Sequence, residues 1–216
     1  MRFEAVLFDC DGVLVDSEPI VNRVLRDMLA ERGWDLSEAE CLQIFVGKMV
    51  RDERARIEHH TGQPLTDAWM ADFRQRRNAA LMAELQVVPH AQAAVHAVHA
   101  RTEGRIACAS GADRHKVEFQ LRKTDLHPYF EGRIFSGHEM PRSKPHPDVY
   151  LAAAQALAVP AQRCAVVEDT LTGVAAGVAA GATVLAYVPH GDAAPFLQAG
   201  VAQVFRSMAE LPDLLR

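Results

Sequence analysis

The sequence contains no long hydrophobic run and no excess of basic charge. No apolar stretch approaches the roughly 18 residues that a membrane-spanning helix needs. Lysine and arginine total 23 against 28 aspartates and glutamates, a net charge of −5, so no global positive field attracts nucleic acid or an anionic membrane surface. We therefore expect a cytoplasmic protein with no nucleic-acid or membrane partner, in which any bound anion is held by a local site.

Cysteine is also scarce, and no internal repeat or low-complexity tract is found. The four cysteines, Cys10, Cys41, Cys108 and Cys164, lie far apart and show none of the paired spacings typical of metal sites. Most of them fall inside apolar, strand-like runs, where a thiol behaves as a small hydrophobic side chain. The sequence therefore predicts reduced, structural cysteines.

What the sequence does contain is a series of short apolar runs separated by helical stretches. Its 216 residues, 49% of them hydrophobic, suffice for one large domain or for a domain with an insert. The clear runs are Glu4–Phe8, Arg105–Ala109, Ala165–Val167 and Thr183–Tyr187, and the weaker ones are Gly132–Ser136 and Gln203–Phe205. This alternation predicts an α/β fold, a Rossmann-like doubly wound parallel sheet, with its site at the carboxyl ends of the strands.

Almost a hundred residues separate the first run from the second, far more than one crossover helix needs. The apolar spacing between them is helical almost throughout, and Gly33, Gly47 and Gly62 supply the breaks. We expect a helical-bundle cap domain over residues 17–85, inserted into a core domain formed by residues 1–16 and 86–216.

Two aspartates directly follow the first strand-like run. In an extended chain, residues i and i+2 project to one side about 6–7 Å apart, so Asp9 and Asp11 face one space. Two carboxylates there repel each other, and a cation beside them relieves the repulsion. An ordinary acidic turn explains the pattern equally well when it stands alone, because Asp and Gly are common turn formers.

Three further polar pieces follow other apolar runs. Glu168-Asp169 is a second acidic pair suited to an oxygen shell for a hard cation. Ser110-Gly111 supplies a hydroxyl and an unobstructed amide for a phosphoryl group, and Lys144 supplies a point charge. Each piece alone also fits a cap, a turn or a solvated loop. Their occurrence in this order at strand ends favours one shared site.

This constellation resembles the haloacid dehalogenase-like superfamily, in the branch that holds β-phosphoglucomutase-like proteins and sugar-phosphate phosphatases with a helical cap. The resemblance covers nearly the whole chain, and its four motifs are represented by Asp9-x-Asp11-Gly, Ser110, Lys144 and Glu168-Asp169. It implies a phosphatase that acts on a small phosphorylated metabolite through an aspartyl-phosphate.

The same resemblance implies a role for each matched residue. Asp9 is the nucleophile, Asp11 is the general acid and base, and Lys144 neutralises charge near the nucleophile. Ser110 and the Gly111 amide anchor the phosphoryl group. The ligands of Mg²⁺ are Asp9, the carbonyl of Asp11 and Asp169, with Glu168 close by and acting through water. We expect a monomer or a weak homodimer.

Three other functions remain open on the same scaffold: a sugar-phosphate mutase, a haloacid dehalogenase and a non-catalytic binding module. The dehalogenase relatives lack an aspartate at the position of Asp11, and a binding module has no need of both aspartates. The mutase relatives carry a His and an Arg where this chain has Val21 and Val50. Lys48 and Arg51 flank Val50 and either bind a second anionic group of the substrate, such as a carboxylate, or are solvated surface charges. The resemblance to sugar-phosphate phosphatases makes a sugar-acid phosphate the first specific substrate that we expect.

Overall fold

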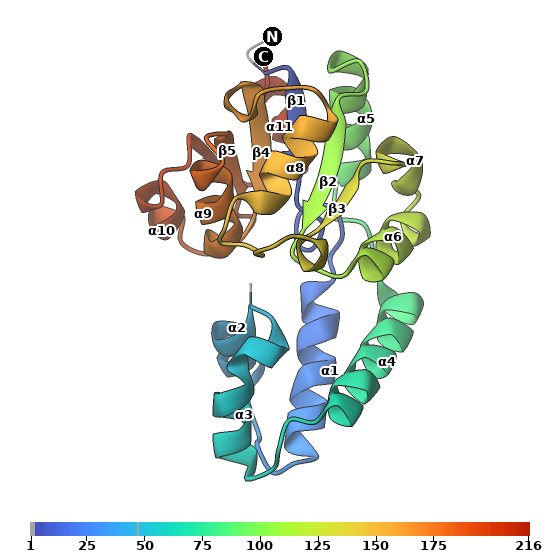
Figure 1. Ribbon diagram of the computed structural model, residues 1–216, viewed down its shortest axis with the longest axis vertical. Helices are drawn as coiled ribbons and strands as arrows, with labels where there is room; N and C mark the ends of the chain where they lie inside the picture. Colours follow the sequence, from blue (N-terminus) through green and yellow to red (C-terminus); the bar gives the residue numbers. More distant parts are fainter. Residues whose placement is uncertain (1–2, 47) are drawn as a thin grey trace. The chain divides into compact units, whose positions relative to one another are not determined.

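The computed structural model describes residues 3–46 and 48–216, which divide into two compact units (Figure 1). One unit holds the described residues up to Asp16 together with Gln86–Arg216, and the other is Ser17–Leu85. Gly47, which the sequence suggested as a helix break, lies outside the described residues.

A six-stranded, fully parallel sheet forms the centre of the first unit and confirms the α/β prediction. Its strand order is β3-β2-β1-β4-β5-β6. The strands are β1 (Ala5–Phe8), β2 (Ile106–Ser110), β3 (Ile134–Ser136), β4 (Cys164–Glu168), β5 (Thr183–Tyr187) and β6 (Gln203–Phe205). All six apolar runs, including the two weaker ones, are therefore strands. Two of them, β5 and β6, have the expected ends, and the other four differ from expectation by one or two residues at an end.

Helices cover both faces of this sheet. Apolar side chains on one face, among them Leu7 and Val166, pack with α8 (Asp148–Ala156) and α9 (Leu171–Ala179). On the other face, the ring of Phe8 lies edge-on to Phe130 of α7 (His127–Phe130), with the ring centroids 5.9 Å apart. The unit also contains α5 (Ala91–Arg101), α6 (Arg114–Lys123), α10 (Ala194–Gln198), α11 (Leu211–Leu214) and the 3-10 turns Gly137–Glu139, Ala161–Arg163 and Met208–Glu210. Because the central strands are buried on both faces, their polar neighbours gather at the strand ends.

The strand order reverses direction at β1, which lies between β2 and β4. Phe8, the last residue of β1, pairs with Cys108 of β2 and with Val167 of β4. Connections from this point run to opposite sides of the sheet, which opens a crevice at the carboxyl ends of the strands. The residue that follows β1 therefore lies at the position where doubly wound folds bind their ligands.

The second unit, Ser17–Leu85, is wholly helical. It consists of α1 (Glu18–Ala30), α2 (Glu38–Phe45), the 3-10 turn η1 (Val50–Glu53), α3 (Arg54–Thr61) and α4 (Asp67–Glu84). Ser37 and Glu40 form a reciprocal capping box at the start of α2, and the Thr66 hydroxyl caps α4. The helices enclose a separate core of residues such as Leu25, Met28, Leu29, Ile57 and Leu65.

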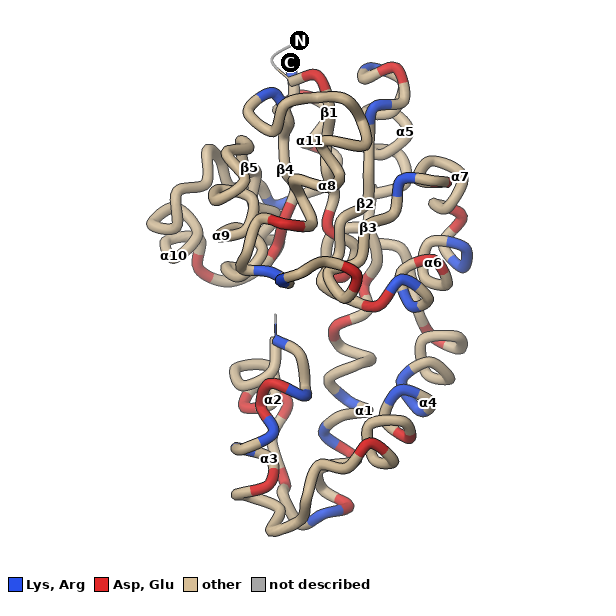
Figure 2. Tube along the Cα trace, viewed as in Figure 1, with Lys and Arg blue, Asp and Glu red and all other residues tan. Residues whose placement is uncertain are grey.

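Both signs of charge occur on the long helices of this unit, α1 and α4 (Figure 2). This mixture agrees with the absence of a global basic field. Among the described helices, none combines the length and the apolar composition that crossing a membrane requires.

Candidate functional site

Asp9 is the residue that directly follows β1. Its backbone N–H donates to the Val167 carbonyl at 3.0 Å, which extends the pairing of β1 with β4 by one residue. Its side chain is buried, and Oδ1 accepts a 2.6 Å hydrogen bond from Lys144 Nζ. The neighbouring strand thus fixes the backbone of Asp9, while the lysine fixes its carboxylate.

Lys144 Nζ also donates to Glu168 Oε1 at 2.7 Å, so one ammonium is shared between two carboxylates. Tyr150 completes this contact, because its hydroxyl donates to the same Glu168 oxygen at 2.7 Å and its ring lies 4.7 Å from Nζ. The other Glu168 oxygen, Oε2, accepts from the Asp169 and Thr170 amides and from the Thr170 hydroxyl. Protein donors therefore occupy both oxygens of Glu168.

The pKa values of the three charged groups are shifted in different directions, because burial, neighbouring charges and hydrogen bonds act on each to a different extent. Burial raises the pKa of Asp9 to about 7, against the opposing pull of Lys144. Burial also opposes ionisation of Glu168, but Lys144 and the surrounding donors outweigh it and hold the pKa of Glu168 below its usual value. The pKa of Lys144 lies well above its usual range, since Asp9 and Glu168 outweigh the effect of burial. Asp9 is thus the carboxylate with most to gain from a second cation.

Asp9, Glu168 and Asp169 each offer a carboxylate oxygen, and these three oxygens lie within 4.8 Å of one another. Three carboxylates and the single ammonium of Lys144 leave a formal charge of −2, which one divalent cation balances. Carboxylate oxygens are the ligands that Mg²⁺ prefers in proteins. The donor set therefore fits a divalent cation of this kind.

Gly173 in α9 makes room for the Glu168 carboxylate. A Cβ atom at position 173 would overlap both oxygens of Glu168. The absence of a side chain at position 173 is thus required by the Glu168 carboxylate. Gly177, one turn later, does serve packing, because a Cβ there would lie 2.7 Å from Cγ2 of Val184 in the sheet.

Asp11 directs its carboxylate to helix α6. Lys116 Nζ lies 2.8 Å from both of its oxygens, and Gln120 Nε2 donates to Oδ1 at 2.8 Å. The Asp11 carboxylate therefore has a cationic partner of its own, because α6 starts close to the end of β2 and brings Lys116 to this aspartate. That Asp9 and Asp11 also share a bound cation stays a prediction.

Ser110 is the last residue of β2, and Gly111 begins the turn that leads to α6. The Ser110 hydroxyl accepts from the Ala112 amide at 3.1 Å, and the Ser136 hydroxyl at the end of β3 donates to the Ala112 carbonyl at 2.6 Å. These bonds hold the turn against the neighbouring strand. Ser110 and Gly111 thus occupy the edge of the sheet that also carries Asp9 and Glu168.

Lys48 and Arg51 belong to the helical unit, and each has an acidic partner there. Lys48 Nζ lies 2.9 Å from Glu53, and Arg51 lies 3.1 Å from the exposed Asp67. Both cationic side chains are exposed, although Glu53 itself is only 14% exposed, so each ion pair contributes at most about 1 kcal/mol and can exchange for a ligand.

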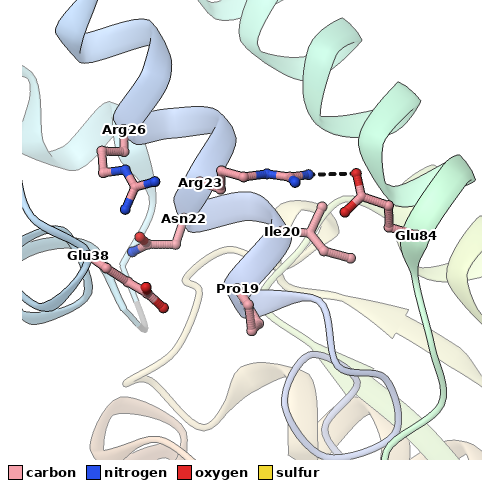
Figure 3. Close-up of a pocket in the computed structure, with 7 residues that line it drawn as sticks. All are labelled: Pro19, Ile20, Asn22, Arg23, Arg26, Glu38 and Glu84. Carbon is pink, nitrogen blue, oxygen red and sulfur yellow. Dashed lines mark hydrogen bonds and ion pairs between the residues drawn. The ribbon is translucent and has the colours of Figure 1, made fainter.

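A pocket of about 250 Å³ lies wholly within the helical unit (Figure 3). It is lined by Pro19, Ile20, Asn22, Arg23, Arg26, Glu38 and Glu84. Arg23 extends from α1 to Glu84 of α4, with 2.6 Å between Nη2 and Oε1, whereas Arg26 lies on the side of α1 that faces Glu38. No residue of the described part of the chain forms an ion pair with Arg26.

Sequence reasoning missed Lys116, Gln120 and Tyr150, and one signal was available for the first. The first turn of α6 carries Arg114, His115 and Lys116 and no acidic residue, although the helix dipole favours acids there. Such a reversal indicates that a positive charge is needed for another purpose. No comparable signal marks Tyr150 or Gln120, which look like ordinary core and helix residues.

Comparison with known proteins places these features in context. A family model described as haloacid dehalogenase-like hydrolase matches residues 3–181. The 6-phosphogluconate phosphatase of Escherichia coli K12 is 30% identical over 215 residues, which cover 99% of this chain and 95% of the relative.

Two solved structures resemble both units of the chain. A haloacid dehalogenase-like protein from Agrobacterium tumefaciens is 28% identical, with a TM-score of 0.85 over 99% of this chain and 97% of the other. A HAD family hydrolase from Deinococcus radiodurans, solved with bound phosphate and sodium, is 35% identical, with a TM-score of 0.78 over 97% and 93% of the two chains.

Proposed function

Because the chain belongs to the haloacid dehalogenase-like hydrolases and is a phosphoric monoester hydrolase, we propose that it hydrolyses a small sugar phosphate or sugar-acid phosphate with the help of Mg²⁺. The observation that carries this proposal is the buried Asp9 carboxylate at the tip of β1, in contact with Lys144 and beside Glu168 and Asp169. The Asp9 carboxylate is thus held by Lys144, and the lysine and a cation bound by the neighbouring carboxylates can offset the negative charge of a phosphate ester.

In the first step, an oxygen of Asp9 attacks phosphorus in line, and the bond from phosphorus to the ester oxygen breaks. Asp11 must enter this step protonated, and it gives this proton to the departing oxygen, so the sugar leaves as an alcohol. Lys144 offsets negative charge beside Asp9, and the Ser110 hydroxyl and the Gly111 amide donate to the phosphoryl oxygens.

In the second step, Asp11, now ionised, removes a proton from a water molecule, whose oxygen attacks the phosphorus of the aspartyl-phosphate. Inorganic phosphate leaves, the Asp9 carboxylate is regenerated, and Asp11 is again protonated. One aspartate thus works covalently while the other moves protons.

The proposed metal ligands are Asp9, the backbone carbonyl of Asp11, and Asp169. A bound Mg²⁺ supplies positive charge to the phosphoryl oxygens during both transfers. Glu168 acts through water, because protein donors already occupy both of its oxygens. It holds Lys144 in place and orients the Asp169 backbone.

We also propose that Ser17–Leu85 is a cap domain that selects the substrate, with Lys48 and Arg51 available for a second anionic group. Val21 and Val50 stand where mutase relatives carry polar ligands, and both pack against the apolar core of this unit. Hydrolysis is therefore favoured over mutase activity. The name of the E. coli relative supports a sugar-acid phosphate as the first substrate to test.

The test is phosphate release from a panel of sugar-acid, sugar and polyol phosphates with Mg²⁺, using wild-type protein and Asp9→Asn. We expect turnover by the wild type alone, and a phosphoryl group on the peptide that contains Asp9 after rapid acid quench. Binding without phosphate release would indicate a binding module. Glucose 6-phosphate that appears from β-glucose 1-phosphate faster than free phosphate would indicate a mutase.

A further inference from the structure

The carboxylate of Asp11 is held from one side by two residues of α6. Lys116 Nζ lies 2.8 Å from each oxygen, and Gln120 Nε2 lies 2.8 Å from Oδ1. Gln120 is fully buried and Lys116 is only 7% exposed, whereas the Asp11 side chain keeps 21% of its surface exposed. The two α6 side chains are therefore shielded from solvent at the point where they contact Asp11, whose own side chain remains partly exposed.

Lys116 lies at an unfavourable position on α6, and Asp11 is the partner that stabilises its charge there. Its position in the first turn sets an ammonium against the positive end of the helix dipole. Burial adds a further cost for an ammonium that lacks a partner. The Asp113 side chain caps the Lys116 amide at 2.9 Å and fixes the start of the helix. Contact with both Asp11 oxygens offsets the costs, which indicates that this charge serves the aspartate.

The orientation of Gln120 is fixed as well. A glutamine amide has one accepting oxygen and one donating nitrogen, which differ in partner. The thiol of Cys10 lies 3.7 Å from Gln120 Oε1 and can donate to it, so Nε2 is the end that faces Asp11. Cys10 and Asp11 are adjacent in the chain, and the same short segment thus sets the amide and receives its hydrogen bond.

We propose that Lys116 and Gln120 are positioning residues that hold the Asp11 carboxylate in the orientation from which it transfers protons. This inference rests on the proposed function. An aspartate free to rotate about two side-chain bonds spends most of its time directed away from the ester oxygen. Three hydrogen bonds from a rigid helix remove that freedom, and orientation of a reacting group is a major contribution to catalysis.

The test uses the different need of two leaving groups for a proton. An alkyl phosphate releases a strongly basic oxygen that must be protonated, whereas 4-nitrophenyl phosphate releases a stable anion. The quantity kcat/KM reports the first transfer and excludes the later attack of water. For Lys116→Met and Gln120→Leu, we expect kcat/KM for the best alkyl phosphate of the panel to fall by about 10- to 100-fold. With 4-nitrophenyl phosphate, the same parameter should change by less than about threefold.

Two further variants and a stability measurement show whether a loss of activity comes from the orientation of Asp11, from the positive charge of α6 or from unfolding. Arg122→Met removes a positive charge from the same helix at a side chain that is 62% exposed. It should leave kcat/KM unchanged for both substrates. Lys116→Arg retains the charge and should recover part of the alkyl activity. Thermal unfolding of each variant shows whether it is folded at the assay temperature.

Each outcome is decisive. A selective loss with the alkyl substrate supports the proposal, even where stability also falls. Equal losses with both substrates, no loss, or faster turnover of the alkyl phosphate would overturn it. If the wild-type protein releases phosphate from neither substrate, the proposed function fails first and the positioning role fails with it.

Discussion

The hydroxyl of Tyr150 donates to Glu168 Oε1 at 2.7 Å, and both side chains are buried. Through this bond, a residue in the first turn of α8 supports the carboxylate that shares Lys144 with Asp9. The bond therefore links the packing of a helix to the orientation of the proposed nucleophile. Residues of this kind, one contact removed from the reacting atoms, determine how precisely the reacting atoms are held.

We expect Tyr150→Phe to lower the free energy of unfolding by about 1–2 kcal/mol, because a buried carboxylate oxygen loses a donor. Activity should fall by about tenfold as Lys144 and Asp9 lose their fixed position. Steady-state kinetics and denaturant unfolding measure the two effects. Tyr129→Phe is the matched control, since its hydroxyl contacts the exposed His96 at 3.1 Å. Equal activity of the two variants would contradict the role of Tyr150.

Gly173 and Gly177 lie one turn apart on α9, yet alanine should act differently at each. A methyl group at 173 overlaps the Glu168 carboxylate, whereas one at 177 meets apolar atoms of Val184. We expect Gly173→Ala to abolish turnover and Gly177→Ala to lower the melting temperature, with kcat largely retained in the folded protein. Turnover by Gly173→Ala at the wild-type rate would show that Glu168 can move without consequence.

The acidic positions of this site were predictable from sequence because each directly follows an apolar strand. Strand ends on one edge of a parallel sheet must meet, so Asp9, Ser110 and Glu168 could be placed near one another without coordinates. The division of the chain could likewise be anticipated, because helical periodicity between the first two runs is unmistakable.

The partners of these residues could not be predicted in the same way. Tyr150 and Gln120 reach the site from helix interiors, and their directions depend on how each helix packs on the sheet. Spacing also suggested that Asp9 and Asp11 face one space, but it gave no sign that Lys116, six residues beyond Ser110, contacts the Asp11 carboxylate. Long-range pairings of this kind are absent from any local pattern.

The reactivity of the cysteines tests whether their thiols are buried. All four are buried, and desolvation raises the pKa of Cys164 to about 11. Because only the thiolate reacts, about one Cys164 thiol in a thousand is reactive at pH 8. Native protein should therefore react with a chromogenic disulfide far more slowly than denatured protein. The denatured protein should release four equivalents of the coloured thiol, one for each cysteine. Rapid titration of a native thiol would contradict this.

Removal of one carboxylate from the acidic group should weaken metal binding. Asp169→Asn changes the formal charge of the group formed by the three carboxylates and Lys144 from −2 to −1, and it replaces an anionic ligand by a neutral one. We expect a smaller rise of the melting temperature on addition of Mg²⁺ and little turnover. In the wild type, chelator should abolish activity, and Ca²⁺ should inhibit because it prefers larger, looser coordination. A wild-type response of Asp169→Asn to Mg²⁺ would exclude Asp169 as a ligand.

Lys144→Met should alter metal binding in the opposite sense. The substitution leaves Asp9 and Glu168 buried without their shared ammonium. It changes the formal charge of the group from −2 to −3. In chelator, the loss of one member of a buried ion pair should lower the free energy of unfolding by about 3–5 kcal/mol. Mg²⁺ should then stabilise this variant more than it stabilises the wild type, because the cation meets less competition for the carboxylates.

Turnover by Lys144→Met should nevertheless stay far below that of the wild type, since the metal cannot also supply the charge that the ammonium brings to Asp9. Melting temperatures with and without Mg²⁺ for the wild type, Asp169→Asn and Lys144→Met therefore test the charge balance without any substrate. We expect Mg²⁺ to raise the melting temperature most in Lys144→Met, less in the wild type and least in Asp169→Asn. A smaller shift in Lys144→Met than in the wild type would mean that the lysine assists metal binding, and the balance of one ammonium and one divalent cation against three carboxylates would be wrong.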